Sequence, residues 1–323
     1  MSTYKQLSGF NIKSLATAPS NLLEGEIWYN STSGTLKVAP LVASWASGGT
    51  YPISSGDGAG AGTQTSAIVF GGKSPPAVNV SATYDGDSWT AGPTLGTARY
   101  SLASAKNGSQ TAALATTGFS TSNTNLCESF DGSSWTEGPN YPVSQQTGDQ
   151  GVGTQTAALI SGGYGGPPGS AYLDATCTYD GTNWTALAAP SNLQDSRFAA
   201  TATGTSTAAV MFSGIGGAAK VESWDGSTWS EQAEALTART AGGSAGTSTD
   251  ALYFGGEAGP GVTGVTEHWN GTSFSTKPAM ATARSAPASC GTAALALATG
   301  GLPATNLTEA YTLAITTETV TTS

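Results

Sequence analysis

The sequence predicts an all-β protein of the β-propeller class, in which short four-stranded antiparallel sheets repeat about a central axis. Three observations predict this fold. A motif with one aromatic residue, Asp-Gly or Asn-Gly, two further residues and a second aromatic residue occurs five times, with copies 45 to 49 residues apart. An apolar run that ends at glycine precedes each copy. Charged residues make up only 10% of the chain, against the usual quarter or so, as expected for closely packed small-residue sheets.

The aromatic motif predicts the outer half of each repeat. Asp-Gly and Asn-Gly between strands favour a two-residue hairpin turn, because both central residues of that turn take positive φ. We therefore expect two aromatic strands joined by a tight turn. The motif copies are Tyr84 to Trp89, Phe130 to Trp135, Tyr179 to Trp184, Trp224 to Trp229 and Trp269 to Phe274.

The apolar run predicts the inner half. A run such as Ala157 to Gly163 is typical of a strand buried on both faces, and its glycine pair suits a sharp exit. A strand of small residues, such as Ser101 to Ala105, comes before it. Four strands per repeat make one propeller blade. A sixth apolar run, Ala293 to Gly301, has no aromatic Asp-Gly motif after it.

The glycine pair, the Tyr-Asp-Gly…Trp unit and the Thr-Ala-Arg at residues 97–99, 237–239 and 282–284 resemble the layout of the kelch family. The resemblance covers about residues 53–323 and implies a kelch-like β-propeller with six blades. Seven blades are the alternative if residues 27–48 and 312–323 form a blade of their own. The chain departs from the family pattern at Thr117-Gly118-Phe119, which lacks the glycine pair, and at Tyr311-Thr312-Leu313, which lacks Asp-Gly. The family layout predicts architecture and leaves the activity open.

Four arginines, the only ones in the chain, stand just before the first strand of a repeat. The same four repeats carry a glutamate two residues before the first aromatic residue of the motif. We expect buried ion pairs within blades, because a planar arginine matches a buried carboxylate. The alternative is an arginine ring that grips an anionic ligand, although its own glutamates would neutralise it. The expected pairs are Arg99–Glu128, Arg197–Glu222, Arg239–Glu267 and Arg284–Glu309.

The N-terminal segment differs from the repeats. Residues 17–38 predict a proline turn, a strand that ends at Ile27-Trp28-Tyr29, a Ser/Thr/Gly loop and a return strand at 35–38. This segment resembles a module of tail fibres and other virion proteins of tailed bacteriophages, which implies docking through Trp28 and Tyr29. Alternatively, the hairpin is an outer strand pair that closes the propeller. We expect a docking segment at residues 1–48 and the propeller at 49–323.

Few residues suit catalysis or metal binding. The chain has one histidine, His268, and three widely spaced cysteines that are expected to be buried. The repeated aspartates sit in turns, where their backbone geometry explains them. The sequence therefore predicts no enzyme activity, no metal site and no cofactor. A net charge of −10 without a basic cluster argues against nucleic acid as a partner. The absence of an apolar stretch of about 20 residues argues against membrane insertion.

Binding residues are expected in the loops that follow the glycine pairs. The candidates are Phe119, Asn123, Asn125, Tyr164 and Tyr172, because aromatic and amide groups together suit sugars or protein surfaces. The resulting hypothesis is a structural component of a tailed bacteriophage virion (tail, fibre or capsid appendage), made in the host cytoplasm. Its expected partners are other virion proteins, in multiple copies per particle, with host-surface glycan as a further partner. The alternative is a lectin-like receptor-binding protein that recognises host polysaccharide.

Overall fold

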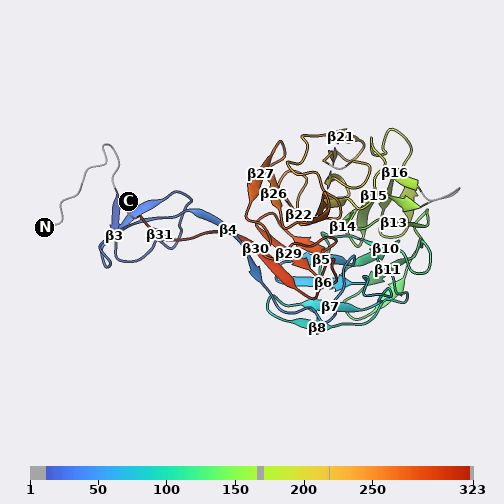
Figure 1. Cartoon of the computed structure of the whole chain (residues 1–323), viewed down its shortest axis with the longest axis horizontal. Coiled ribbons are helices and arrows are strands. Elements are labelled where there is room, and N and C mark those ends of the chain that lie inside the picture. Colours follow the sequence, from blue (N-terminus) through green and yellow to red (C-terminus); the bar gives the residue numbers. More distant parts are fainter. Residues whose placement is uncertain (1–11, 166–170, 218, 321–323) are drawn as a thin grey trace. The chain divides into compact units, whose positions relative to one another are not determined.

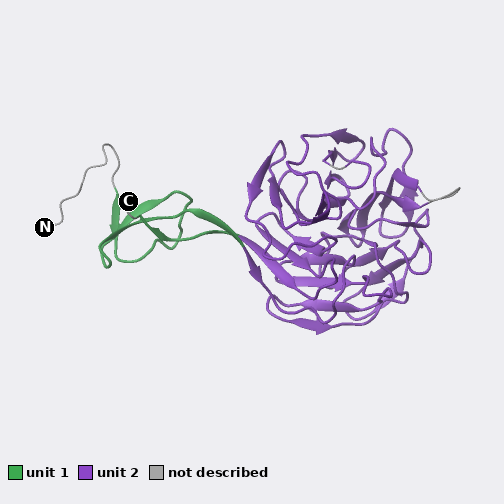
Figure 2. Ribbon diagram, in the orientation of Figure 1, with its two compact units in different colours: residues 1–44, 313–323 green, residues 45–312 purple. Residues whose placement is uncertain are grey.

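The computed structural model describes residues 12–165, 171–217 and 219–320. Within these residues the regular elements are β-strands, and the architecture is all-β and β-propeller-like (Figure 1). The chain divides into two compact units, shown in different colours in Figure 2. Unit 1 takes residues 1–44 and 313–323, and unit 2 takes residues 45–312. The sequence analysis placed the boundary after residue 48 and assigned the C-terminal residues to the propeller.

The repeats form antiparallel sheets that share one strand order, from a small-residue first strand to an aromatic fourth strand. The described residues contain six such sheets, numbered here in chain order. Sheet 1 has β5 (Ala59–Thr63), β6 (Ser66–Phe70), β7 (Ser81–Tyr84) and β8 (Trp89–Ala91); sheet 2 has β9 (Ala103–Ser104), β10 (Leu114–Thr116), β11 (Cys127–Phe130) and β12 (Trp135–Glu137). Sheet 3 has five strands: β13 (Gln145–Gln146), β14 (Gly151–Thr154), β15 (Ala157–Gly165), β16 (Ala171–Tyr179) and β17 (Trp184–Ala186).

The later sheets follow the same order. Sheet 4 has β18 (Thr201–Thr205), β19 (Ala208–Phe212), β20 (Val221–Trp224) and β21 (Trp229–Glu231). Sheet 5 has β22 (Gly243–Gly246), β23 (Ala251–Phe254), β26 (Thr266–Trp269) and β27 (Phe274–Lys277), with the small ribbon β24 (Glu257–Ala258) and β25 (Gly261–Val262) between them in sequence. Sheet 6 has β28 (Ala288–Gly291), β29 (Leu295–Thr299), β30 (Thr308–Ile315) and, from the N-terminal part of the chain, β4 (Leu41–Ser47).

Strand β4 supplies the fourth strand that the last repeat lacks in sequence. Its Trp45 ring lies edge-on to Phe254 and Tyr311, at centroid distances of 5.0 and 5.4 Å. The Trp45 indole Nε1 donates to Thr266 Oγ1 at 3.1 Å. A segment some 250 residues away in sequence thus completes sheet 6 and packs against sheet 5.

Neighbouring sheets meet along their first strands, in the series β5, β9, β14, β18, β22, β28 and again β5. Side chains from adjacent sheets pack together between them; Tyr84 of sheet 1, for example, lies with Cys290 and Leu297 of sheet 6. Outer tryptophans add hydrogen bonds between sheets. The Nε1 of Trp89 in sheet 1 donates to Thr308 Oγ1 in sheet 6 at 2.9 Å, and this hydrogen bond adds to the packing contacts between the two sheets.

The Asp-Gly turns differ from the two-residue turns expected from the sequence. Tyr84 pairs with Trp89, so four residues, 85–88, form each loop. Only the glycine has positive φ, 101° at Gly86, while the Asp85 carboxylate accepts the N–H groups of Asp87 and Ser88 at 3.0 and 2.8 Å. The aspartate is therefore required for its side-chain acceptor, and Asn270 takes the same role in sheet 5.

Unit 1 is built around one sheet, with β1 (Lys13–Leu15), β2 (Ile27–Asn30), β3 (Thr35–Val38) and β31 (Glu318–Thr319) in that order. Strands β2 and β3 form the hairpin expected from the sequence. Trp28 lies on one side of the sheet and is 1% exposed. The register places Ile27, Tyr29, Leu36 and Val38 together on the other side, and we call these four residues the apolar face of unit 1. Ile27 is 46% exposed.

Candidate functional site: the central pocket and its rim

A ring of backbone hydrogen bonds lies at the start of the first strands of unit 2. A residue in left-handed conformation, with φ between 47° and 65°, stands two residues before five of these strands and three residues before β14. The amides of five of these residues donate to the ring residue of the preceding sheet, for instance Ser101 N to Asp57 O at 2.9 Å and Ala286 N to Ala241 O at 2.6 Å. Sheet 4 bonds to sheet 3 one position further on, from Ala202 N to Asp149 O at 3.0 Å. Asp57 N donates to Ala286 O at 2.9 Å, which joins sheet 1 to sheet 6. The six ring residues are Asp57, Ser101, Gly148, Ala199, Ala241 and Ala286.

All six ring residues line a single pocket of about 190 Å³. Apolar walls come from Phe198, Ile215 and Leu302, and Glu257 stands among them. Because every sheet contributes one ring residue, the pocket belongs to the whole repeat array. A concave site of this kind is where a ligand is expected to bind.

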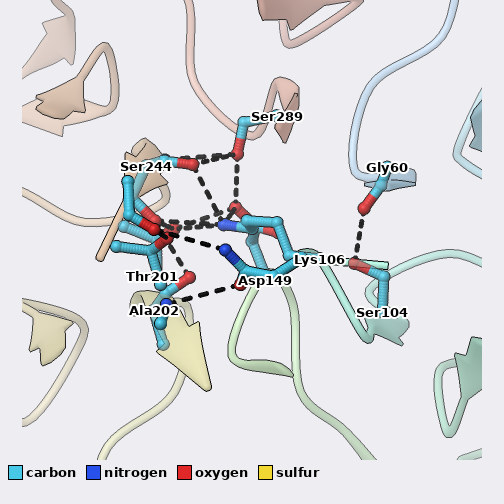
Figure 3. Close-up of polar contacts among 12 residues, drawn as sticks. Gly60, Ser104, Lys106, Asp149, Thr201, Ala202, Ser244 and Ser289 are labelled. Carbon is cyan, nitrogen blue, oxygen red and sulfur yellow. Dashed lines mark hydrogen bonds and ion pairs between the residues drawn. The ribbon is translucent and has the colours of Figure 1, made fainter. Parts of the chain in front are cut away.

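A buried ion pair lies next to the pocket, among the first strands (Figure 3). Lys106 is 1% exposed, and its Nζ lies 2.5 Å from Asp149 Oδ2. The same ammonium donates to Ser244 Oγ at 3.0 Å and to Thr201 Oγ1 at 3.2 Å. Burial lowers the pKa of Lys106, and the Asp149 charge opposes that shift. Burial and the ion pair thus act in opposite directions on the Lys106 charge, and the pair reduces the cost of burying it.

Asp149 also connects several sheets. Its Oδ2 accepts hydrogen bonds from the hydroxyls of Thr201 and Ser289, both at 2.8 Å. Its Oδ1 is buried and has no hydrogen-bond partner among the described residues. Burial raises the pKa of Asp149, and the Lys106 charge opposes the rise. We call Lys106, Asp149, Thr201, Ser244 and Ser289 the axial network.

The charged groups at the centre occupy positions where the other repeats carry small or apolar residues. Lys106 stands five residues after its ring residue, where each of the other sheets has a glycine with positive φ. A lysine does not readily adopt that conformation, and β9 of this sheet is only two residues long. Asp149 likewise replaces Gly, Leu, Ala or Pro, and Asp57 replaces Ser, Gly or Ala. The glycines are Gly62, Gly153, Gly204, Gly246 and Gly291.

Asp57, Lys106 and Asp149 were not predicted as functional residues from the sequence. These three residues form no recognisable sequence motif, because successive members are 49 and 43 residues apart. The signal was present in the repeats, because aligning them on the strand-end glycine shows a lysine at one copy only. The predicted binding residues lie in the loops after the glycine pairs, whereas these three residues lie near the ends of the first strands.

The residues that follow the glycine exits occupy equivalent positions in the sheets, and we call them the rim; Ile215, Glu257 and Leu302 of this set line the pocket, and Phe119 and Tyr164 do not. Phe119, Tyr164, Ile215, Glu257 and Leu302 occupy this position in sheets 2 to 6. Bridges to the segment before the first strand hold them, as between Tyr100 and Phe119, whose rings lie 5.4 Å apart. Lys73 takes this position in sheet 1, so the rim is basic there, aromatic in sheets 2 and 3 and aliphatic or acidic in sheets 4 to 6.

The structure brings four of the five predicted binding residues together on this rim. The Tyr164 ring lies 5.9 Å from Tyr172 and 5.8 Å from Phe198. Asn123 pairs with Phe119 in a bridge and donates from Nδ2 to the Tyr164 carbonyl at 3.3 Å. Tyr172 is 43% exposed. Asn125 holds its loop instead, through a carbonyl that accepts from Tyr141 N at 2.8 Å.

The four arginines form ion pairs with the four glutamates within their own sheets, away from the pocket. Arg239–Glu267 and Arg284–Glu309 are 2.7 Å pairs, Arg99–Glu128 is a 3.1 Å pair, and Arg197 pairs with Glu222. Each arginine is at most 1% exposed. The glutamates also accept backbone N–H groups, as from Gln194 to Glu222 at 2.9 Å. None of the four arginines lines the pocket, so the alternative of an arginine ring around a ligand has no support in this geometry.

Other reactive residues have structural surroundings. His268 Nε2 lies 2.6 Å from Asp250 Oδ1, and Cys127, Cys177 and Cys290 are buried free thiols. Across residues 12–165, 171–217 and 219–320, no three His, Cys, Asp or Glu side chains are placed to share a metal ion. A search of the same ranges finds no helix with the length and apolarity to cross a membrane.

Comparison with known proteins returns no relative: no protein-family model matches the chain, and no curated protein matches it.

Proposed function

We propose that unit 2 is a closed, six-bladed, kelch-like β-propeller. Three observations support closure. The first strands of sheets 1 and 6 contact each other, Asp57 N bonds to Ala286 O, and Trp89 bonds to Thr308. The pocket lined by one ring residue from every sheet supports a blade count of six. An experimental structure with a seventh sheet in the ring, or with a gap between β28 and β5, would contradict this proposal.

We further propose that the chain is a structural component of a tailed bacteriophage virion, with unit 1 as its docking part. The observation that carries the proposal is the apolar face of unit 1. It lies in the segment that resembles phage tail-fibre modules, and Ile27 is 46% exposed although its side chain is large and apolar. Tyr29, Leu36 and Val38 beside it are half-buried. Apolar side chains grouped at a surface mark a site of protein contact, and other virion proteins are the partners that the resemblance implies.

Mass spectrometry and cryo-electron microscopy of purified particles from a phage that encodes this chain test the proposal. A fixed, symmetric copy number is the expected result. Ile27→Glu should leave unit 2 folded and remove the protein from particles, because a charge on the apolar face prevents docking. Leu295→Glu is the matched control, since Leu295 is 44% exposed but belongs to sheet 6. Absence of the wild-type chain from particles, or equal loss with both variants, would refute the docking role.

The rim favours a second candidate, the lectin-like receptor-binding protein. Tyr164, Tyr172 and Phe198 form a partly exposed aromatic cluster beside the Asn123 amide, a combination that suits sugar rings. Binding to a glycan array that is lost in Tyr172→Ala and kept in Leu236→Ala, whose side chain is 60% exposed elsewhere, would support this function. If the wild-type chain bound no glycan on the array, the lectin-like function would be refuted.

A further inference from the structure

We propose that the central pocket binds a primary ammonium group on an aliphatic stem, such as an alkylamine or the side chain of a lysine. Asp57 and Glu257 would hold the ammonium, and the apolar wall of the pocket would cover the stem. This inference does not depend on the virion role.

The charge of the pocket lining is the first reason. Three acidic residues line the pocket, the exposed Glu257 and the half-buried Asp57 and Asp149, and no lysine or arginine does so among the described residues. Lys106, which does not line the pocket, neutralises the charge of Asp149 through their ion pair. Asp57 and Glu257 have no ion pair within 4.0 Å in the part of the chain that the structure describes. The charge of Lys73, on the rim, opposes the rise in the pKa of Asp57, while its Nζ lies 5.1 Å from the centroid of the Tyr100 ring.

The hydrogen-bonding groups are the second reason. Asp57 accepts one bond, from Ser101 Oγ at 2.5 Å, and Glu257 accepts one from Ser285 Oγ at 3.0 Å. The Oδ1 atom of Asp149 also lacks a partner, but this atom is buried and is not counted here among the acceptors open to a ligand. The pocket therefore offers acceptors in excess and requires a ligand rich in donors. An ammonium has three donors and no acceptor.

The walls and the volume define the rest of the ligand. Phe198, Ile215 and Leu302 supply apolar surface opposite the alanines of the ring. A volume of about 190 Å³ exceeds the roughly 150 Å³ that accommodates a benzene molecule. A four- or five-carbon stem fits this space, and a bare metal ion does not, because no three ligand side chains of the described residues converge on one point.

Burial raises the pKa of Asp57, and a bound cation would oppose that rise. Asp57 is also the only carboxylate in the ring, where the other sheets have Ser, Gly or Ala. Its residue type is therefore not needed for the backbone conformation. This supports a role for the side chain itself.

Titration of the full chain with n-butylamine at neutral pH, followed by calorimetry or ligand-observed NMR, tests the proposal. We expect n-butylamine to bind, and n-butanol and butyrate to bind at least about tenfold more weakly, since only the amine carries the charge that the carboxylates select. Binding should weaken as salt is added. Equal binding of n-butanol, or no binding of n-butylamine, would overturn the proposal.

Asp57→Asn and Glu257→Gln should each weaken n-butylamine binding several-fold without lowering the melting temperature, since asparagine also tolerates positive φ. Glu231→Gln, on the outer strand β21, is the matched control and should leave binding unchanged. Equal effects of all three variants would show a general charge effect and refute the site. Nα-acetyl-lysine methylamide, compared with cadaverine, distinguishes the sources: tighter binding of the former indicates a lysine of a partner protein, and tighter binding of the latter a free amine.

Discussion

Replacing Glu222 by alanine tests whether the buried Arg–Glu pairs stabilise each sheet. Glu222 is fully buried, pairs with Arg197 and accepts the Gln194 N–H at 2.9 Å. Without it, Arg197 keeps long hydrogen bonds to the carbonyls of Asp195, Ser213 and Lys220, at 3.2 to 3.3 Å, and a 4.0 Å contact with the Asp195 carboxylate. Carbonyls do not neutralise the charge, so we expect a loss of about 3–5 kcal/mol in the free energy of unfolding. For a unit of this size that is a fall of about 6–20 °C in melting temperature.

The chain offers a control for this experiment on the neighbouring strand. Glu231 is the direct cross-strand partner of Glu222, but its side chain is 52% exposed and its nearest cation, Lys220, is 3.8 Å away. Glu231→Ala should change the free energy of unfolding by less than about 0.5 kcal/mol. Differential scanning calorimetry of both variants gives the comparison, and Asp87→Ala in an exposed turn serves as a second reference. Equal melting temperatures for Glu222→Ala and Glu231→Ala would refute the stabilising role of the pair.

Three further predictions concern the axial network, the turns and strand β4. Lys106→Met should lower the free energy of unfolding by about 3–5 kcal/mol, because it leaves the Asp149 carboxylate buried and unpaired. Adding Asp149→Asn should recover much of this loss, as measured by urea unfolding. A double variant no more stable than Lys106→Met would contradict the pairing. Backbone N–H groups of Thr228 and Ser227 lower the pKa of Asp225 to about 2, so its stabilisation is present above the unfolded pKa and is lost as pH falls through about 2. Asp225→Asn should keep the turn, as Asn270 does, and should unfold with less pH dependence between about pH 4 and about pH 2 than wild type; an unchanged urea profile over that range would count against this. Deleting residues 1–47 removes β4 and exposes the edge of β30, so the shortened chain should melt lower and aggregate by light scattering; an unchanged melting curve would show that β4 is dispensable.

The sheets could be predicted from the sequence because their determinants are local and repeated. In five repeats an apolar run that ends at glycine is followed by two aromatic strands, and each copy predicts the same four-stranded sheet. The Arg–Glu pairs were predictable for a related reason: both members recur in the same four repeats, so that their joint presence indicates contact. The two-residue turn was wrong because Asp-Gly was interpreted through backbone conformation alone. The structure shows that the Asp85 carboxylate caps two N–H groups of a longer loop.

The pocket could not be predicted in the same way, because it depends on how the repeats are arranged around one centre. Phe119, Tyr164 and Tyr172 were found as isolated aromatic residues in loops, yet their grouping with Phe198 follows from the rim. The membership of strand β4 in sheet 6 was likewise open from sequence, since a hairpin that docks and a strand that closes a sheet can both follow residue 38. In the structure the hairpin stays in unit 1 and the next strand completes sheet 6.

A repeat protein contains its own comparison, because each position of one repeat can be judged against the others. Five of the six ring residues are serine, glycine or alanine, as close packing of the first strands requires. Lys106 and Asp149 depart from the pattern of the repeats together and compensate each other as an ion pair, so stability accounts for both. Asp57 also departs from the pattern, and its structural partners are one hydroxyl donor, Ser101, and the charge of Lys73 on the rim. These two partners oppose the cost of burying the carboxylate but leave its pKa raised. A cationic ligand in the pocket would offset the rest of that cost.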